Sequence, residues 1–264
     1  MTARFLEAAG HRLEYAWWGP GPGARPTLVL LHEGLGCVEM WRDFPRQLSK
    51  ATGLGVFAYS RLGYGRSDPV PLPRPLRYMH NEARLLPKVL KAVGIEDAIL
   101  VGHSDGASIA IICAGSGGCA TVARALILEA PHVFAEDVGL RSIALARDLF
   151  QAGDLAAKLA RYHGDNLQGA FWGWNGAWLH PDFRFWNLEE YLPAIRVPVL
   201  LIQGEDDEYG TLKQVEAIQT QAGSAVEVCL LPGCGHSPHR DRPAEVLAEM
   251  ARFASAVEIR RPPV

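Results

Sequence analysis

The chain lacks the features that mark membrane, secreted and nucleotide-binding proteins. No apolar run approaches the roughly 20 residues needed to cross a bilayer, and the N-terminus lacks the unbroken apolar stretch of a secretory signal. The patterns GxGxxG, HExxH and GxxxxGK followed by Ser or Thr are absent. The net charge of -3 and the dispersed basic residues predict no nucleic-acid groove and no membrane-binding surface. We therefore expect a soluble protein with no cofactor, no metal, no nucleic-acid partner and no membrane partner.

Cysteine is scarce and shows no pairing pattern. The five cysteines include no CxxC pair: Cys37, Cys113, Cys119, Cys229 and Cys234. A chain of 264 residues buries a core large enough to fold without crosslinks. The pattern favours free thiols in a reducing compartment, so we predict a cytoplasmic protein. Two small arginine clusters, Arg74–Arg77 and Arg260–Arg261, are expected on solvated surface.

Short apolar runs rich in β-branched residues alternate with longer amphipathic stretches, which is typical of a mostly parallel sheet covered by helices. The clearest runs are expected to form buried strands: Thr27–His32, Gly55–Ser60, Ala98–His103, Ala125–Ala130, Val197–Gly204 and Val226–Leu231. Helices are expected at Met40–Ala51, Met79–Val93, Ala107–Ala114 and Ala244–Val257.

The alternation stops between His132 and Ile195, where aromatic residues crowd together without a strand pattern. We predict a helical insertion, the cap, at residues 132–195, and a core domain formed by residues 1–131 and 196–264. The aromatic rings either pack the cap against the core domain or form the wall of an apolar ligand site. Trp172 and Trp174 are candidates for that wall.

The sequence GHSDG (Gly102–Gly106) stands where an apolar strand ends and a helix of small residues begins. A sharp turn there strains the backbone of Ser104 and brings strand and helix so close that only glycine fits at Gly102 and Gly106. Ser104 is then exposed at the tip of the strand, near the positive end of the following helix. We predict that Ser104 is a nucleophile.

A serine hydroxyl needs a base and an orienting acid to become a nucleophile. His236 follows the last apolar strand on a glycine-rich loop and is the predicted base. Asp207 follows the preceding strand and is the preferred acid, with Asp206 and Glu129 as alternatives. A zinc site at His236, His239 and Cys234 is rejected because the chain offers no matching second pair of ligands.

Four motifs together resemble those of the α/β-hydrolase superfamily of serine hydrolases with a helical cap: HEGLG (His32–Gly36), YSRLGYGRS (Tyr59–Ser67), GHSDG (Gly102–Gly106) and GHSPHRDRP (Gly235–Pro243). The resemblance covers essentially the whole chain. It implies a mostly parallel, eight-stranded α/β-hydrolase fold with helices on both faces. It also implies an oxyanion hole made by the backbone N–H groups of Asp105 and Gly34. Ser104 stands where haloalkane dehalogenases and epoxide hydrolases carry Asp, which argues against those two activities.

Two carboxylate residues beside the expected oxyanion hole depart from the family pattern. Glu33 replaces a glycine, and Asp105 replaces a residue that is commonly nonpolar. Unpaired and charged, they would oppose catalysis, so each is expected to have a partner, such as Arg61 or Arg42, or to point away. Alternatively, one of them, Glu33 being the candidate, binds a cationic or hydroxyl group of the substrate.

The predicted function is cleavage of a small carboxylic ester, or a related acyl compound, through an acyl-enzyme intermediate. The partner is a small-molecule substrate with an apolar part, and the sequence predicts no oligomeric state. The alternatives on the same triad are a thioesterase, a lactonase and a carbon–carbon bond hydrolase. A non-catalytic ligand-binding receptor of the same fold is the alternative from another class of protein.

Overall fold

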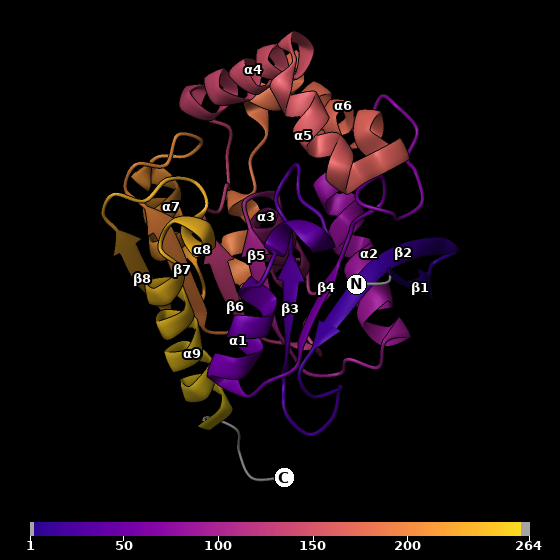
Figure 1. The fold of residues 1–264 in the computed structure, drawn as a ribbon. Coiled ribbons are helices and arrows are strands. Elements are labelled where there is room, and N and C mark those ends of the chain that lie inside the picture. Colours follow the sequence, from indigo (N-terminus) through magenta and orange to yellow (C-terminus); the bar gives the residue numbers. More distant parts are fainter. Residues whose placement is uncertain (1–2, 260–264) are drawn as a thin grey trace.

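The computed structural model describes residues 3–259 as an eight-stranded sheet covered by helices on both faces (Figure 1). The strands stand in the order β1-β2-β4-β3-β5-β6-β7-β8. Six of them run parallel: β3 (Thr27–Leu31), β4 (Val56–Tyr59), β5 (Ala98–His103), β6 (Ala123–Glu129), β7 (Val199–Gly204) and β8 (Val226–Leu231). The sheet and all six strands expected from the apolar runs are confirmed, but β8, which was expected to be buried, is only half-buried because it lies at the edge of the sheet.

The central strands are apolar throughout because both of their faces are buried. In β3, Leu28 and Leu30 pack into one core cluster, whereas Val29 and Leu31 pack into the other. Successive side chains of a strand point to opposite faces, so a strand covered on both sides needs apolar residues at every position.

Two further strands form an antiparallel hairpin at one edge of the sheet. They are β1 (Arg4–Ala8) and β2 (His11–Trp18), and β2 also pairs antiparallel with β4. β1 mixes buried and exposed residues, and the last four residues of β2 are all half-buried. Polar residues interrupt both strands, so neither forms the continuous apolar run that marks a strand buried on both faces.

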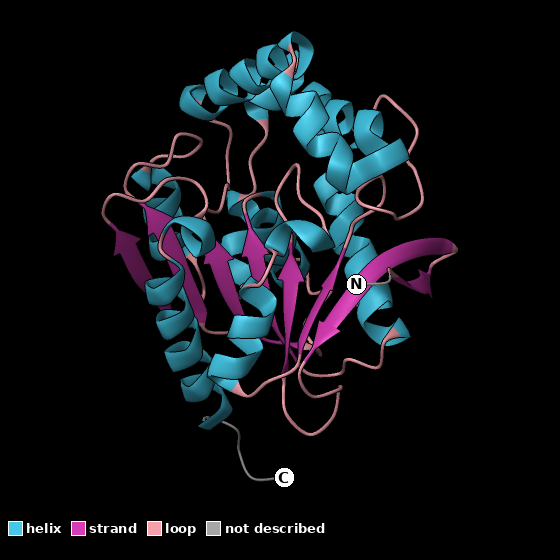
Figure 2. Cartoon of the chain, viewed as in Figure 1, coloured by secondary structure: helices cyan, strands magenta, loops and turns pink. Residues whose placement is uncertain are grey.

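Helices cover the two faces as two separate layers (Figure 2). One face packs against α1 (Phe44–Thr52) and α9 (Pro243–Ile259), and the other against α2 (Tyr78–Ala92), α3 (Asp105–Gly115) and α7 (Leu212–Gln221). Four of the five were expected. The sequence LKQVEAIQTQ of α7 has few apolar residues, so its helical periodicity was too weak to recognise.

The segment between β6 and β7 forms helices that lie beyond the carboxyl ends of the parallel strands (Figure 1). Its elements are α4 (Asp137–Ala152), α5 (Asp154–His163), η2 (Gly164–Asn166), α6 (Leu167–Trp178), η3 (Pro181–Phe185) and η4 (Glu189–Ala194). Phe150 of α4 stacks on Phe171 of α6 with ring centroids 3.7 Å apart. Within residues 3–259, no helix is both long enough and apolar enough to cross a bilayer.

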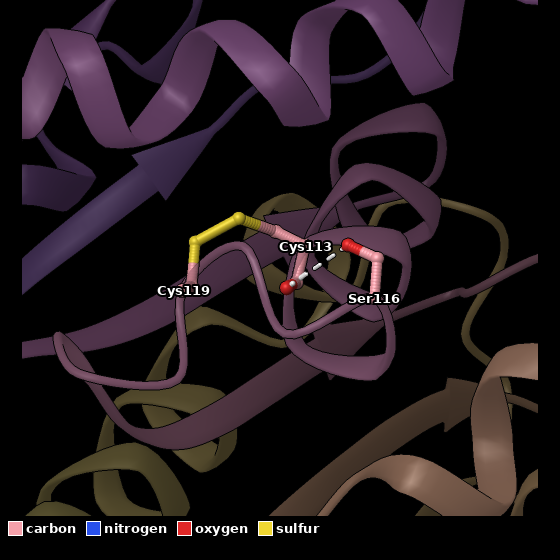
Figure 3. Close-up of a disulfide and its surroundings, with 3 residues drawn as sticks. All are labelled: Cys113, Ser116 and Cys119. Atoms are coloured by element: carbon pink, nitrogen blue, oxygen red, sulfur yellow. Dashed lines mark hydrogen bonds between the residues drawn. A yellow bond between two sulfur atoms is a disulfide. The ribbon is translucent and has the colours of Figure 1, made fainter.

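The expectation of five free thiols is wrong for two of them. Cys113 and Cys119 form a disulfide, whereas Cys37, Cys229 and Cys234 are free (Figure 3). Cys113 lies in the last turn of α3, and a glycine-rich turn brings the chain back so that the two Cα atoms are 5.4 Å apart. A spacing of six residues was not recognised as a pairing signal. The cytoplasmic location stays a prediction.

Arg74 is also not where it was expected. It is buried, and its guanidinium donates hydrogen bonds to the Tyr64 hydroxyl, the Leu62 carbonyl oxygen and the Glu82 carboxylate. A buried cation needs such partners, and they come from a neighbouring loop and from α2. The cluster Arg260–Arg261 lies outside the described residues.

Candidate active site

Ser104 occupies a sharp turn between β5 and α3. Its φ of 53° lies in the left-handed region that favours glycine, so the strained backbone predicted at this position is present. A Cβ atom on Gly102 would collide with the backbone of Ala107, and one on Gly106 would collide with the backbone of β3. The two glycines permit this close approach, which leaves Ser104 at the carboxyl end of β5.

Three side chains from distant parts of the chain form one line of hydrogen bonds. His236 Nε2 lies 2.9 Å from Ser104 Oγ, and His236 Nδ1 lies 2.8 Å from Asp207 Oδ1. Asp207 follows β7 and His236 follows β8, so both loops leave the sheet at the edge where β5 ends. With Nδ1–H donating to the carboxylate, Nε2 is free to accept the proton of the Ser104 hydroxyl.

The surroundings of Asp207 favour its ionised form. Burial opposes ionisation, but the hydrogen bond from His236, the charge of that ring and the Tyr209 N–H outweigh burial and lower the pKa of Asp207 to about 2. The Gln203 side-chain amide donates a further bond to Oδ2, at 2.8 Å. Asp207 therefore stays a carboxylate at neutral pH and holds the orientation of the His236 ring.

The alternative acids do not face His236. Glu129 Oε2 lies 2.6 Å from Nδ1 of another histidine, His239, and Asp206 is exposed on the loop surface. Among the residues described, no cluster of three or more histidine, cysteine or carboxylate side chains fits a metal ion. The structure thus brings Ser104, His236 and Asp207 together, and it pairs Glu129 elsewhere.

The two expected oxyanion donors, Asp105 and Gly34, line the same cavity as Ser104. Asp105 is the first residue of α3, where backbone N–H groups have no carbonyl partner within the helix. Gly34 lies in the loop after β3, and a Cβ atom on it would collide with the Trp174 indole. Glycine at this position therefore lets α6 approach the loop that carries the second donor.

The buried cation Arg61 contacts the segments that hold both expected oxyanion donors, Asp105 and Gly34. The Arg61 guanidinium is fully buried, donates to the backbone carbonyl oxygens of His32 and Glu33, and lies 3.7 Å from the Asp105 carboxylate. The Glu33 carbonyl belongs to the same peptide group as the Gly34 N–H, and in a trans peptide the two point in opposite directions. By holding the Glu33 carbonyl oxygen, Arg61 therefore fixes the direction in which the Gly34 N–H points.

The Asp105 side chain has the partners that its charge requires. Besides Arg61, it accepts a hydrogen bond from the Tyr78 hydroxyl at 2.6 Å and one from Trp178 Nε1 at 3.2 Å. Burial raises the pKa of Asp105, and these three partners oppose that rise. Arg61 is thus the partner expected for one carboxylate, whereas Arg42, the other candidate, is exposed.

Glu33 is paired with a histidine instead of an arginine. Its Oε2 lies 3.7 Å from Nδ1 of the buried His103, whose Nε2 is 2.7 Å from the His236 carbonyl oxygen. Burial opposes ionisation of Glu33, but His103 outweighs it and holds the pKa of Glu33 well below its usual range. Burial lowers and Glu33 raises the pKa of His103, with a net rise. Glu33 is therefore an anion held beside His103, which also contacts the loop that carries His236.

A cavity of about 250 Å³ lies next to Ser104 and is enclosed partly by the helical segment. Its apolar lining includes Ile143 of α4, Leu155 and Leu159 of α5, and Trp174 and Trp178 of α6. Its polar lining includes Glu33, Gly34, His132 and Tyr209. Burial, followed by the charge of His236, lowers the pKa of His132 to about 4, so this second ring at the cavity is neutral at neutral pH.

Of the two tryptophans predicted for the cavity wall, the structure brings only Trp174 there. Trp172 packs edge-on against Phe150 and Phe171, and its Nε1 donates to Gln168 on the same helix. The contribution of Trp178 was missed, although it follows Trp174 by four residues and so lies on the same helix face. Tyr78 and His132 were also missed, and nothing in their local sequence marks them as site residues.

Comparison with known proteins agrees with this geometry. A family model described as the alpha/beta hydrolase family matches residues 28–249. The chain is 24% identical over 221 residues to the bifunctional esterase/perhydrolase DCH of Acinetobacter calcoaceticus, covering 74% of this chain and 78% of that protein. It is 32% identical over 109 residues to epoxide hydrolase B of Mycobacterium tuberculosis, covering 40% of this chain and only 30% of that protein.

Solved structures share the fold across the whole chain. The proline iminopeptidase of Mycobacterium smegmatis superposes with a TM-score of 0.73 at 21% identity, covering 98% of this chain and 99% of that one. The enol-lactonase of Burkholderia xenovorans LB400 gives a TM-score of 0.73 at 19% identity, covering 96% of this chain and 100% of that one. At these identities the structures show the fold alone. The family model decides the assignment: the chain belongs to the alpha/beta hydrolase family and is a hydrolase.

Proposed function

We propose that this hydrolase cleaves a small carboxylic ester, or a related acyl compound, through an acyl-enzyme intermediate on Ser104. The observation that carries the proposal is the hydrogen-bonded line from Asp207 through His236 to Ser104, which ends at a cavity with apolar walls. A serine held this way is activated for attack on a carbonyl carbon.

Each step of acyl transfer then has a residue to serve it. His236 Nε2 takes the Ser104 proton as Oγ attacks the carbonyl, and returns it to the leaving group when the tetrahedral intermediate collapses. The N–H groups of Asp105 and Gly34 stabilise the oxyanion, and the Asp207 carboxylate stabilises the imidazolium. In the second half-reaction His236 activates a water molecule, which releases the acid and restores Ser104.

Residues 132–195 act in this proposal as a cap that shapes the substrate site. Trp174 and the aliphatic side chains of α4 and α5 offer an apolar surface, which suits a substrate with an apolar part. The esterase named among the relatives supports ester cleavage. Epoxide hydrolysis is disfavoured because Ser104 stands where epoxide hydrolases carry Asp. Lactones, thioesters and carbon–carbon bonds beside a carbonyl fit the same residues.

The test is labelling and turnover in matched variants. A fluorophosphonate probe should label the wild-type chain and fail to label Ser104→Ala, with Ser116→Ala as the control. Turnover of nitrophenyl esters of graded acyl length should fall by about 10⁴-fold or more in Ser104→Ala, because only binding and the oxyanion donors remain. Thioesters and dienoic ring-cleavage products, assayed in parallel, identify the bond that is cleaved. A wild-type chain that neither labels nor turns over any of these substrates would instead be a ligand-binding receptor.

A further inference from the structure

A second hollow adjoins the catalytic cavity at its rim. It has a volume of about 320 Å³, and its lining includes four cations: Arg42, Lys158, Arg161 and Arg240. Four side chains line both this hollow and the catalytic cavity: Met40, Leu155, Leu159 and Arg240. We call this hollow the basic groove. A substrate that fills the cavity beside Ser104 can therefore extend over this shared wall into the groove.

The groove collects positive charge in a chain whose net charge is -3. Its four cations come from three separate parts of the fold. Arg42 follows η1 (Val38–Trp41), Lys158 and Arg161 belong to α5, and Arg240 lies on the short helix α8 (Pro238–Asp241) just after the His236 loop. No carboxylate lines the groove.

The nearby carboxylates leave most of this charge uncompensated. Asp154 is 3.8 Å from Lys158, but both side chains are exposed and their attraction is screened by water. In the adjoining cavity, Glu33 is engaged by His103, and Glu208 accepts a bond from the His236 N–H. Among residues 3–259, the guanidinium groups of Arg42, Arg161 and Arg240 form no ion pair and no side-chain hydrogen bond.

We infer that the basic groove binds an anionic group, a carboxylate or a phosphate, carried by the substrate at the end remote from the bond that Ser104 attacks. This inference rests on the proposed function. Guanidinium groups match the planar, two-pronged geometry of carboxylate and phosphate, and three of them lie here without a protein partner. The apolar part of the substrate occupies the cavity between α6 and Ser104, and its charged end lies among cations supplied by both the cap and the core domain.

Kinetics on matched esters test the inference. The p-nitrophenyl monoester of adipate and p-nitrophenyl hexanoate have acyl chains of equal length, and only the first carries a terminal carboxylate. The pair 4-carboxyphenyl hexanoate and its methyl ester places the charge on the leaving group instead. At low salt, kcat/KM for the anionic member of at least one pair should exceed that of its neutral partner about tenfold. The advantage should shrink toward unity in roughly 0.5 M salt, because the groove is exposed.

Charge reversal locates the effect. Arg161→Glu should lower the ratio of kcat/KM for the anionic ester to that for its neutral partner about tenfold, because it replaces an attraction with a repulsion. Arg141→Glu makes the same change in charge on an exposed residue of α4 outside the groove, and it should leave the ratio within about twofold. Equal turnover of both members of each pair, or a preference that survives Arg161→Glu, would overturn the inference.

Binding without chemistry separates this inference from the proposed function. In the Ser104→Ala background, calorimetry should show octyl phosphate and octanoate binding at least tenfold more tightly than octanol, and Arg161→Glu should remove the difference. Such binding in a chain that cleaves no ester would refute the proposed function and support anion binding in the basic groove. Equal turnover of neutral and anionic esters, with equal binding of all three probes, would refute anion binding in the groove and support the proposed function. Comparing octyl phosphate with octanoate decides between phosphate and carboxylate.

Discussion

Replacing Asp207 with asparagine is the sharpest test of the catalytic assignment, because it removes a charge while keeping the shape of the side chain. In the native site the carboxylate accepts bonds from His236 Nδ1–H, the Tyr209 N–H and the Gln203 amide. The asparagine oxygen can take the place of Oδ1, which the Tyr209 N–H fixes. Its NH₂ group then takes the place of Oδ2, 2.9 Å from His236 Nδ1, and favours the wrong tautomer of the ring.

The size of the effect follows from the charge of the carboxylate. Its surroundings lower the pKa of Asp207 from 3.8 to about 2, which corresponds to roughly 2 kcal/mol in favour of the ionised form. The contributions that lower this pKa are led by His236, so the imidazolium loses a similar stabilisation in the variant. That loss alone lowers kcat about 30-fold, and the wrong tautomer extends the loss to as much as about 10⁴-fold.

The assay is kcat on a nitrophenyl ester, with circular dichroism and thermal melting to check the fold. Asp206→Asn removes the same charge one residue away on the exposed loop, and Glu129→Gln alters the acid that faces His239. Both should lower kcat less than about tenfold. A folded Asp207→Asn variant with kcat within fivefold of wild type would refute the reasoning, and a large loss in Glu129→Gln alone would move the acid to Glu129.

Three further predictions concern the cavity wall, acid stability and the disulfide. Trp174→Ala should raise KM for a hexanoate ester about tenfold more than for an acetate ester, because about 1–3 kcal/mol of apolar contact with the acyl chain is lost. Trp172→Ala should lower the melting temperature without changing that ratio, and equal shifts in KM would mean that both rings only pack. The low pKa of His132, about 4, means that unfolding takes up a proton between pH 6.5 and pH 4. The free energy of unfolding should therefore fall by about 3 kcal/mol as pH decreases across this window, and a slope unchanged in His132→Gln, measured by urea titration, would contradict this. Thiol titration of the unreduced, denatured protein should find the three cysteines that are free in the structure, and all five after reduction. Cys113→Ala should cost about 2 kcal/mol in urea unfolding, the loop-closure value for six residues, and an unchanged midpoint would speak against the crosslink.

The parts of the fold that could be read from the sequence are those where one local rule dominates. Strands buried on both faces need apolar residues at every position, so β3–β7 stand out as runs, and the half-buried β8 stands out because it is polar only at Glu227. The strand β2 and the helix α7 mix polar and apolar residues because each is only partly buried. In α6, Trp174 and Trp178 are four residues apart and lie on one helix face, whereas Trp172 does not. This spacing favours Trp178 over Trp172 as the second tryptophan of the cavity wall.

The candidate site also has parts that the sequence predicts and parts that it does not. Ser104, Asp207 and His236 were predictable because each follows a strand of the parallel sheet, and parallel strands deliver their carboxyl ends to one edge. The cations of the basic groove could not be predicted as a cluster. Arg42, Arg161 and Arg240 come from three separate segments, and more than a hundred residues separate Arg42 from Arg240. Their proximity depends on how the helices between β6 and β7 pack against the rest of the chain, which no local pattern encodes. The disulfide was missed for a related reason, because the turn that closes it is set by glycines and not by cysteine spacing.

The hydrogen bond from Trp178 to Asp105 bears on how this chain can be engineered and how it can change. Asp105 is buried, and one of its two hydrogen-bond donors, Trp178, belongs to α6. A chimaera that receives a foreign segment between β6 and β7 would lose the Trp178 donor and the Trp174 ring that packs over Gly34. Both side chains lie next to the N–H groups of Asp105 and Gly34, which are the proposed oxyanion donors. Such a graft needs a new donor to Asp105 in place of Trp178 Nε1, because an apolar residue at position 105 would leave the buried Arg61 without its carboxylate partner. The segment between β6 and β7 and the rest of the chain are therefore not interchangeable modules here, and substitutions at 105 and 178 are expected to be accepted as a pair.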